Sequence, residues 1–254
     1  MGKISIVMAY NNRKKLLRYT LNTIICSEVK DFEIIIVDDC SREEERIECL
    51  KEEFPTINFN IIRLEQKDKW YSNPCIPYNI GFRQIKGDLV IIQNPECCYN
   101  GDILKYVLEN CSNNSYNVHA CYSLNENDTY NILHKNEKVK IANRAATIDG
   151  DSAWYVNSRL FTRYLHFCSS ITKKDLFELG GFDERYAKGF AYDDNEFFER
   201  IRRKGMKMNI CDNPFVFHQF HYSSPRDFKN VTQNNEHIFR TITLRENIIR
   251  PQEL

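Results

Sequence analysis

Short apolar runs alternate with more polar segments through the first half of the chain. The runs cover residues 4–9, 32–37, 59–64 and 89–93, and each has the length and composition of a buried strand. Leucine and isoleucine recur at the spacing of one helix face between the first two runs, which predicts a helix over residues 14–25. Strands and helices that alternate in this way indicate an α/β fold with a mainly parallel central sheet flanked by helices.

Polar side chains follow three of the predicted strands directly. The clusters are Ala9-Tyr10-Asn11-Asn12, Asp38-Asp39 and Asn94-Pro95-Glu96. Because sheets of this kind bind ligands beyond the carboxyl ends of their strands, we expect the three clusters to converge at one edge of the fold. The sequence therefore predicts a ligand site at that edge.

Helix signals in the first half also include Ser41, which is followed by Glu44 at the spacing of a capping box. A short helix is predicted over residues 79–85.

The second half is less regular, and residues 125–159 are polar without a clear period, as in an insertion that shapes a substrate site. The helices expected in this half cover residues 101–110, 172–179, 193–204 and 234–249. The strands expected there cover residues 118–124, 164–171 and 206–211.

Two of these helices carry clear end signals. Thr172 is expected to cap the helix over residues 172–179, and Gly180 ends it. In the helix over residues 193–204, Phe197, Phe198 and Ile201 are expected to face inward. Its basic C-terminal end complements the helix dipole and is interpreted as solvated. The basic residues are Arg200, Arg202, Arg203 and Lys204.

Composition excludes several classes of protein. The chain has 254 residues, with 35 Lys and Arg against 35 Asp and Glu, so it lacks the basic excess of a nucleic-acid-binding protein. No apolar run approaches the roughly 20 residues of a membrane span, and no secretory signal is visible, so we expect a cytoplasmic protein. The ten cysteines are irregularly spaced without a C-x-x-C pair, which indicates reduced, mostly buried thiols.

Several motifs, taken in order, resemble one family. They are residues 4–13 followed by Leu17 and Leu21, residues 33–41 with their Asp38-Asp39-Cys40-Ser41 ending, Asn79-Ile80-Gly81 with Gly87-Asp88, and Gly180-Gly181-Phe182-Asp183-Glu184 with Asp193-Asp194. Their order and spacing resemble the GT-A-fold glycosyltransferases, specifically the inverting enzymes of family 2, and the last motif resembles galactosyltransferase C-terminal regions. The resemblance covers about residues 4–221. It implies one domain with a nucleotide-sugar-binding half over residues 1–100, an acceptor-binding and catalytic half over 101–222 and a helical tail over 223–254.

The chain departs from this family at its metal motif. The usual D-x-D is replaced by Asn94-Pro95-Glu96, which keeps one carboxylate and one amide oxygen. The resemblance implies a divalent cation, Mn²⁺ or Mg²⁺, bound by Glu96 and by a C-terminal histidine. His218 is the first choice and His221 the competing one. Alternatively, both histidines cap a strand or fill an aromatic cluster.

The resemblance also implies residues that bind the donor. Asp39 would accept hydrogen bonds from the nucleotide base while Asp38 supports the loop or ribose, although Asp is also common in solvated turns after strands. Tyr10 would stack on the base and Arg13 would reach the diphosphate, unless Arg13 is an ordinary first-turn helix residue. The remaining donor-side candidates are Ala9, Asn12, Asn79 and Asn94.

Asp193 and Asp194 are the catalytic candidates. An inverting transfer needs a base for the acceptor hydroxyl, and the resemblance assigns Asp194 to this role and Asp193 to binding that hydroxyl. The alternative is that both acids offset the helix dipole. Trp154 and Tyr192 are candidates for the acceptor site, and core filling is the alternative for Trp154.

The leading hypothesis is therefore an inverting transferase that moves a sugar from a nucleotide sugar, with UDP as the first choice of nucleotide, to a hydroxyl of a glycan, protein or lipid-linked acceptor. A sugar-phosphate nucleotidyltransferase would need a glycine-rich loop that Asn11-Asn12-Arg13 does not supply. A third hypothesis is a degenerate carbohydrate- or nucleotide-binding module of the same fold. The leading hypothesis requires Asp39, Glu96 and Asp194 to face one common site.

Overall fold

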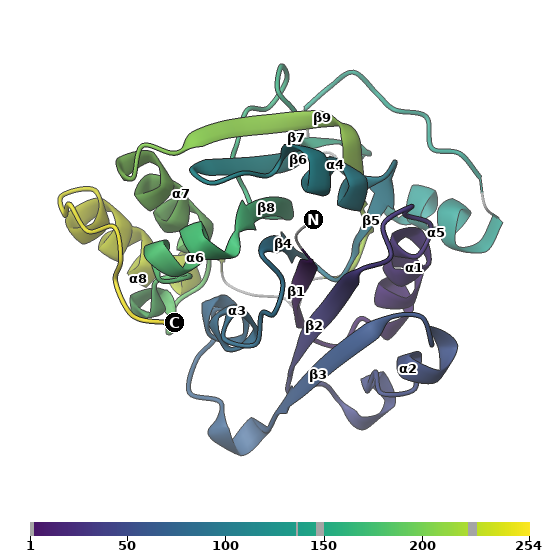
Figure 1. Ribbon diagram of the computed structural model, residues 1–254, viewed down its shortest axis with the longest axis horizontal. Helices are drawn as coiled ribbons and strands as arrows, with labels where there is room; N and C mark the ends of the chain where they lie inside the picture. The colour runs from purple at the N-terminus through teal and green to yellow at the C-terminus, as the bar shows by residue number, and fades with distance from the viewer. Residues whose placement is uncertain (1–2, 136, 146–149, 223–227) are drawn as a thin grey trace.

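The computed structural model describes residues 3–135, 137–145, 150–222 and 228–254. Its described residues form one nine-stranded mixed sheet in the order β3-β2-β1-β4-β8-β6-β9-β5, with β7 paired to β6 (Figure 1). The strands are β1 Ile4–Tyr10, β2 Phe32–Asp39, β3 Asn58–Leu64, β4 Leu89–Gln93, β5 Cys97–Asn100, β6 Ser115–Ser123, β7 Ala153–Val156, β8 Cys168–Thr172 and β9 Lys207–His218.

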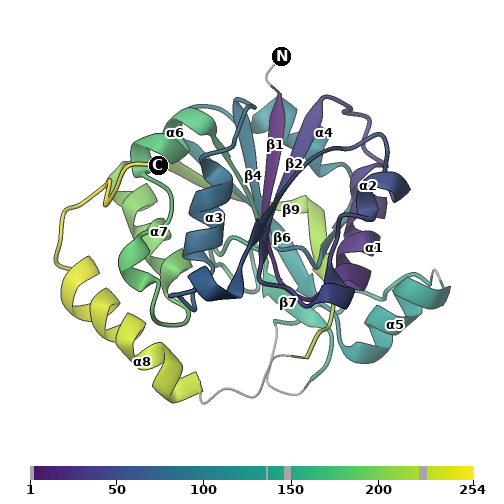
Figure 2. The same cartoon turned by 90° about the horizontal axis from the view of Figure 1, so that it is seen from below.

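Helices cover both faces of this sheet. In Figure 2, α3, α6 and α7 lie on one side of the strands, and α1, α2 and α4 lie on the other. The α-helices are α1 Lys14–Ile24, α2 Leu50–Glu53, α3 Cys75–Phe82, α4 Ile103–Asn110, α5 Glu126–Lys135, α6 Lys173–Leu179, α7 Asp193–Arg203 and α8 Phe228–Ile238. Short helical turns are η1 Glu43–Glu45, η2 Gln66–Asp68, η3 Glu184–Tyr186 and the π-helical η4 Phe239–Thr243.

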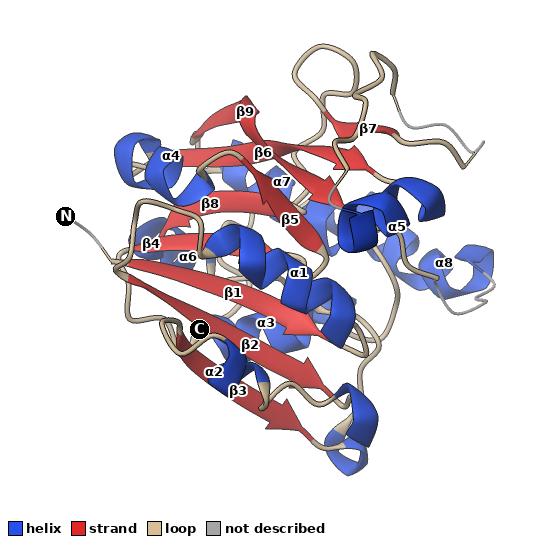
Figure 3. Ribbon diagram, turned by 90° about the vertical axis from the view of Figure 1, so that its right-hand side faces the viewer, coloured by secondary structure: helices blue, strands red, loops and turns tan. Residues whose placement is uncertain are grey.

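The four strands of the first half are parallel, as predicted. β1 pairs with both β2 and β4, and β2 pairs with β3, all in parallel register. Figure 3 shows the arrowheads of β1, β2 and β3 ending along the same edge of the sheet. The aliphatic side chains of β1, β2 and β4 are buried, and they form the centre of the core.

Helix α3 packs very closely on these strands because Gly81 lacks a side chain. A Cβ atom at Gly81 would lie 2.6 Å from Cγ1 of Val7, closer than atoms in contact can approach. The sheet becomes mixed beyond β4, because β8 runs antiparallel to both β4 and β6, whereas β9 runs parallel to β6. This half brings the C-terminal strand to the same edge as the first strands.

Several predicted elements differ in the structure. No helix begins at Ser41, because the Ser41 hydroxyl accepts a hydrogen bond from the backbone N–H of Asn12. Only the short turn η1 follows. The helix predicted over residues 79–85 starts earlier, at Cys75, and the final helix is shifted to Phe228–Ile238. The unassigned stretch over residues 125–159 contains α5 and β7, while residues 136 and 146–149 within it lie outside the described residues.

The signals at α6 and the cysteines are confirmed. The Thr172 side chain accepts a hydrogen bond from the backbone N–H of Asp175, and Gly180 ends the helix at a φ of 73°. All ten cysteines are free. In the described part of the chain, no helix combines the length and the hydropathy needed to cross a bilayer.

Candidate active site

The loops after β1 and β2 are joined by hydrogen bonds at the carboxyl edge of the sheet. The Asn11 side chain donates to the backbone oxygen of Asp39 at 2.6 Å, and the Asn12 side chain accepts from the backbone N–H of Arg42 at 2.9 Å. Asn12 has a φ of 50°, a left-handed conformation that Asn tolerates better than most residues. Asn12 therefore builds the edge on which a donor would lie. Ala9, half-buried, lies opposite Val37 in the same edge.

Asp38 and Asp39 have different environments. Asp38 is fully buried and accepts hydrogen bonds from the Ser41 backbone and from Arg63, both at 2.9 Å. Asp39 keeps 18% of its side chain exposed, and it contacts Lys69 Nζ at 2.6 Å and the Tyr71 hydroxyl at 2.8 Å. Burial, and then this hydrogen bond to Asp39, raises the pKa of the Tyr71 hydroxyl, so it stays a donor. Asp38 therefore supports the loop, whereas the Asp39 carboxylate stays partly accessible at this edge.

Three of the predicted site residues belong to the core instead. Tyr10 is fully buried and its hydroxyl donates to the backbone oxygen of Glu45, so its ring has no free face for stacking on a base. Trp154 is 7% exposed and packs edge-on against Tyr122, so core filling is its role. The sequence does not separate such residues from site residues, because both follow strands or lie in polar segments.

Asn79 is the third predicted site residue that lies in the core. It is fully buried, its side-chain nitrogen donates to the Phe182 backbone oxygen at 2.8 Å, and its side-chain oxygen accepts from the Phe182 N–H at 2.9 Å. With both polar atoms engaged, Asn79 holds α3 to the segment after α6 and does not reach a donor.

A compact group of Glu96, His218 and His221 lies beside β5 and β9. Strand pairing places Cys97 opposite His218, and the Gln219 backbone donates to the Glu96 backbone oxygen at 3.1 Å. The ligand atoms of the three side chains all lie within 4.8 Å of one another. Sequence reasoning treated the two histidines as alternatives, but the end of β9 brings both to the same carboxylate.

Contacts of Glu96 are concentrated on one oxygen. Oε1 lies 3.2 Å from His218 Nε2, 3.4 Å from His221 Nε2 and 2.8 Å from Arg13 Nη1. Oε2 is buried and has no hydrogen-bond partner among the described residues. Burial by itself would raise the pKa of Glu96, but Arg13 and the two histidines hold that pKa well below its ordinary value. Glu96 is therefore an ionised, 2% exposed carboxylate with a free oxygen.

These residues fit a divalent cation. Ligand distances near 2.1 Å in octahedral geometry place neighbouring ligand atoms about 3 Å apart, which is close to the separations between Glu96 Oε1 and the imidazole nitrogens. The buried Oε2 would offer a cation a further oxygen ligand. Asn94, which replaces the first Asp of the family motif, is engaged elsewhere, because its side-chain oxygen accepts from the Tyr78 hydroxyl at 3.0 Å.

Asp193 and Asp194 begin α7 after two residues in left-handed conformations, Ala191 and Tyr192. Asp193 is 5% exposed and accepts a hydrogen bond from Asn73 at 3.1 Å. Asp194 is half-buried, and burial followed by the charge of Asp193 raises its pKa to about 6, although nearby His166 counteracts this. A carboxylate with such a pKa is a suitable base near neutral pH.

A segment between β3 and α3 links the two acidic sites. Its Lys69 and Tyr71 contact Asp39, and its Asn73 contacts Asp193. The Tyr78 hydroxyl, which follows in α3, has a pKa that burial and then the charges of Glu96 and Asp193 raise well above its ordinary value. The segment thus contacts Asp39 and Asp193, and the Tyr78 hydroxyl donates to Asn94, two residues before Glu96. Sequence reasoning missed Lys69, Tyr71 and Asn73 because a loop without periodicity carries no signal for such long-range contacts.

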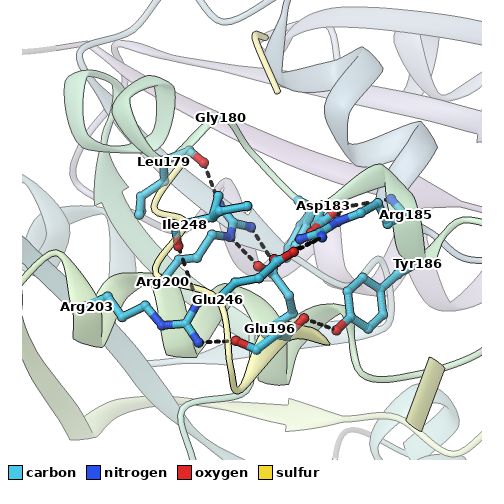
Figure 4. Close-up of polar contacts among 12 residues, drawn as sticks. Leu179, Gly180, Asp183, Arg185, Tyr186, Glu196, Arg200, Arg203, Glu246 and Ile248 are labelled. Carbon is cyan, nitrogen blue, oxygen red and sulfur yellow. Dashed lines mark hydrogen bonds and ion pairs between the residues drawn. The ribbon is translucent and has the colours of Figure 1, made fainter. Parts of the chain in front are cut away.

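A buried ion pair lies under the acidic start of α7. Arg200 is fully buried, in contrast to the predicted solvated helix end, and its guanidinium contacts Glu196 at 2.5 and 2.6 Å. It also donates to the backbone oxygens of Leu179 and Gly181 (Figure 4). The C-terminal segment covers this network, where Gln252 donates to the Gly180 and Phe182 backbone oxygens. Arg200 thus holds α7 to the turn after α6.

One cavity of about 820 Å³ lies away from this edge. It is lined by residues at the start of β4 and the end of β8, among them Asp88, Leu89, Thr172 and Lys173. Since it adjoins the amino end of the parallel strand β4, it does not receive the three predicted clusters. The chemistry-bearing side chains lie at the opposite end of the sheet.

Comparisons with known proteins agree with this arrangement. Residues 5–177 match the model of glycosyl transferase family 2, and residues 161–222 match a model described as the N-terminal domain of galactosyltransferase. A curated relative, an uncharacterized glycosyltransferase of Haemophilus influenzae, is 29% identical over 132 residues, which cover 50% of this chain and 42% of the relative.

Solved structures with the same fold include S. aureus TarS and the Pyrobaculum calidifontis mannosyltransferase PcManGT. TarS residues 1–349 in complex with UDP align with a TM-score of 0.61 at 17% identity, over 91% of this chain and 64% of that one. PcManGT in complex with GDP-Man and Mn²⁺ aligns with a TM-score of 0.58 at 15% identity, over 98% of this chain and 66% of that one. This chain spans less than two thirds of each of these relatives. The predicted GT-A fold is confirmed.

Proposed function

The chain belongs to glycosyl transferase family 2, and we propose that it is an inverting glycosyltransferase that uses a nucleotide-sugar donor. The observation that carries this proposal is the position of two acidic groups at one edge of the sheet. Glu96 with His218 and His221 forms the first, and Asp193 with Asp194 forms the second. Between the two groups, Asn73 donates to Asp193, and the Tyr78 hydroxyl of α3 donates to Asn94, two residues before Glu96. Residues 1–100 would bind the donor and residues 101–222 the acceptor.

Glu96, His218 and His221 would hold a divalent cation, Mn²⁺ or Mg²⁺. When bound, such a cation neutralises the charge that develops on the diphosphate leaving group. Arg13 lies beside this group with 33% of its side chain exposed, so its guanidinium is able to turn toward a diphosphate. PcManGT, which shares the fold, is known in complex with GDP-Man and Mn²⁺, and this supports the assignment of a metal.

Asp194 would remove the proton from the acceptor hydroxyl. The acceptor oxygen then forms a bond to the anomeric carbon while the bond from that carbon to the diphosphate breaks, and its electron pair leaves with the diphosphate. Attack opposite the leaving group inverts the configuration. Asp193, fixed by Asn73, would accept a hydrogen bond that orients the acceptor. Tyr192 directly precedes this pair and would contact the acceptor sugar.

Asp39 would select the nucleotide. Its carboxylate accepts hydrogen bonds, and uracil and guanine present N–H donors on their pairing edges where cytosine and adenine present acceptors. Lys69 and Tyr71 hold the carboxylate in place. UDP is our first choice because TarS complexes contain UDP and UDP-GlcNAc.

The test is turnover of a panel of UDP- and GDP-sugars with Mn²⁺ or with EDTA. We expect hydrolysis or transfer from at least one donor, inhibition by EDTA, and an increase of kcat/KM with pH that levels off above about 6, the pKa of Asp194. Asp194→Asn should lower kcat by about 10²–10⁴-fold. Binding of UDP without turnover of any donor would instead indicate the degenerate binding module.

A matched variant separates the base from its neighbour. Asn195→Ala changes an exposed residue that directly follows Asp194 on α7, and it should retain near wild-type turnover. Equal losses in Asp194→Asn and Asn195→Ala would show that the start of α7 is only structurally important, and the assignment of the base would be wrong.

A further inference from the structure

Arg13 and a bound cation would compete for the same carboxylate, that of Glu96. Arg13 Nη1, His218 Nε2 and His221 Nε2 all approach Oε1, while Oε2 has no partner. A cation held by Glu96 and both imidazoles would lie among those same three ligand atoms. The Arg13 guanidinium, at 2.8 Å from Oε1, would then be next to a second positive charge. Charges at this separation repel each other, most strongly where water is largely excluded.

We propose that Arg13 and the divalent cation bind Glu96 alternately. In the protein without donor, Arg13 neutralises the buried carboxylate and keeps its affinity for the cation low. When a donor binds, its diphosphate attracts the guanidinium away from Glu96 and the cation takes its place. This inference rests on the proposed function, because it requires a donor with a diphosphate.

The position of Arg13 permits such an exchange. Arg13 is the residue before α1, with non-helical backbone angles of −139° and 36°, and its backbone N–H is fixed by the Tyr10 hydroxyl at 3.1 Å. Its side chain is one third exposed, and within the described ranges Glu96 is its one ion-pair partner. Rotation of the side chain alone therefore releases Glu96, without any change in the helix.

Linkage makes the proposal measurable without catalysis. If Arg13 opposes the cation, then Arg13→Met must increase the affinity for Mn²⁺ in the absence of nucleotide. Couplings between two sites of one protein commonly change an affinity by about 5–150-fold, so we expect tightening of about tenfold. UDP itself also binds Mn²⁺, and therefore the measurement without nucleotide is the decisive one.

The experiment is titration of Mn²⁺ by electron paramagnetic resonance or calorimetry into wild type, Arg13→Met and Arg18→Met, with and without UDP. Arg18 is the matched control, since it lies on α1, the helix that Arg13 precedes, and pairs with Glu53 at 2.6 Å on the surface. The expected result is tighter nucleotide-free binding in Arg13→Met alone, and a smaller gain on adding UDP than in wild type. Arg13→Gln is a second variant if Arg13→Met does not fold, as judged by circular dichroism.

Unchanged or weaker nucleotide-free binding in Arg13→Met would overturn the inference, because Arg13 would then support the site or have no influence on it. The metal assignment is tested separately by Glu96→Gln, which should abolish Mn²⁺ binding in the absence of UDP. If wild type binds Mn²⁺ through Glu96 but Arg13→Met does not tighten it, the inference fails and the proposed function stands. If no variant binds Mn²⁺, both the inference and the proposed metal site are wrong.

Discussion

Two glutamate–arginine pairs lie at the two sides of the site, and they differ in how completely their polar atoms are paired. In the Glu196–Arg200 pair of α7, both side chains are at most 1% exposed, and each carboxylate oxygen accepts from the guanidinium. The same guanidinium also donates to two backbone oxygens of the turn after α6. In the Glu96–Arg13 pair, one oxygen has three neighbours and the other has none.

This difference separates a structural ion pair from an exchangeable one. A buried pair with every polar atom satisfied has no better alternative, so it fixes the two segments that it joins. A buried carboxylate oxygen without a partner has lost its hydration without compensation, so it favours a ligand that can reach it. The first arrangement fits a support for the acidic start of α7, and the second fits a site that changes occupant.

The largest effect is expected from breaking the structural pair. Arg200→Met leaves Glu196 ionisable and buried without its partner, and removal of one member of such a pair typically costs about 3–5 kcal/mol. Urea unfolding should therefore show a large loss in the free energy of unfolding. Burial already raises the pKa of Glu196 against the lowering effect of Arg200, so without Arg200 this carboxyl should protonate more readily. The loss in the free energy of unfolding of Arg200→Met should therefore be smaller at acidic pH than at neutral pH.

Arg202→Met is the matched control for this prediction. Arg202 lies on the same helix, is 59% exposed and pairs with Glu199 at 2.9 Å, so its loss should change the free energy of unfolding by less than about 0.5 kcal/mol. Similar losses in the two variants would mean that the Glu196–Arg200 pair does not hold α7 in place.

A second, smaller effect on stability is expected at Asp194, the acid at the start of α7. The pKa of Asp194 is raised from 3.8 to about 6, so the folded protein binds this proton more tightly than the unfolded chain. Ionised Asp194 therefore destabilises the fold above pH 6, and Asp194→Asn should stabilise it there by about 1–3 kcal/mol while lowering kcat as given above. The gain should diminish as the pH falls from about 6 toward 4, where Asp194 is protonated in the folded protein.

Thermal or urea unfolding of wild type and Asp194→Asn across this pH range shows whether the substitution raises or lowers the free energy of unfolding. Asn195→Ala is the matched control, because it changes an exposed neighbour on α7 without removing a charge and should give no pH-dependent gain. A loss of stability in Asp194→Asn at pH 7 would mean that ionised Asp194 stabilises the start of α7, and the predicted destabilisation by this carboxylate would be wrong.

The sequence predicted the parallel half of the fold and the gathering of polar residues at the carboxyl edge of its strands, because both follow from local patterns. Buried strands and the polar residues after them are visible in a single run of residues, as for Asp39 and Glu96. The environment of Arg200 was not predicted, since a helix end rich in basic residues is usually solvated. Its signal was Glu196 four residues earlier, on the same face as Phe197 and Ile201.

Other errors have a different physical origin. Tyr10 and Asn79 were assigned to the donor site because they follow or precede the right strands, but the direction of a side chain depends on packing from distant segments. The contacts of Lys69, Tyr71 and Asn73 join residues about 30 to 120 positions apart, and no local pattern encodes them. The sequence thus places strands and their ends more reliably than it distinguishes site side chains from core side chains.

The smallest effect on stability is expected at the exchangeable pair. In Arg13→Met, Glu96 keeps both imidazoles within 3.4 Å of Oε1, and Arg13 itself is one third exposed, so we expect a loss of about 1 kcal/mol or less in EDTA. Mn²⁺ should then stabilise Arg13→Met more than wild type at the same concentration, because the free energy gained on binding increases with affinity. Urea unfolding with EDTA and with Mn²⁺ measures both quantities. A loss as large as that of Arg200→Met, without recovery in Mn²⁺, would mean that Arg13 is a second structural anchor, and the two pairs would then differ in exposure but not in role.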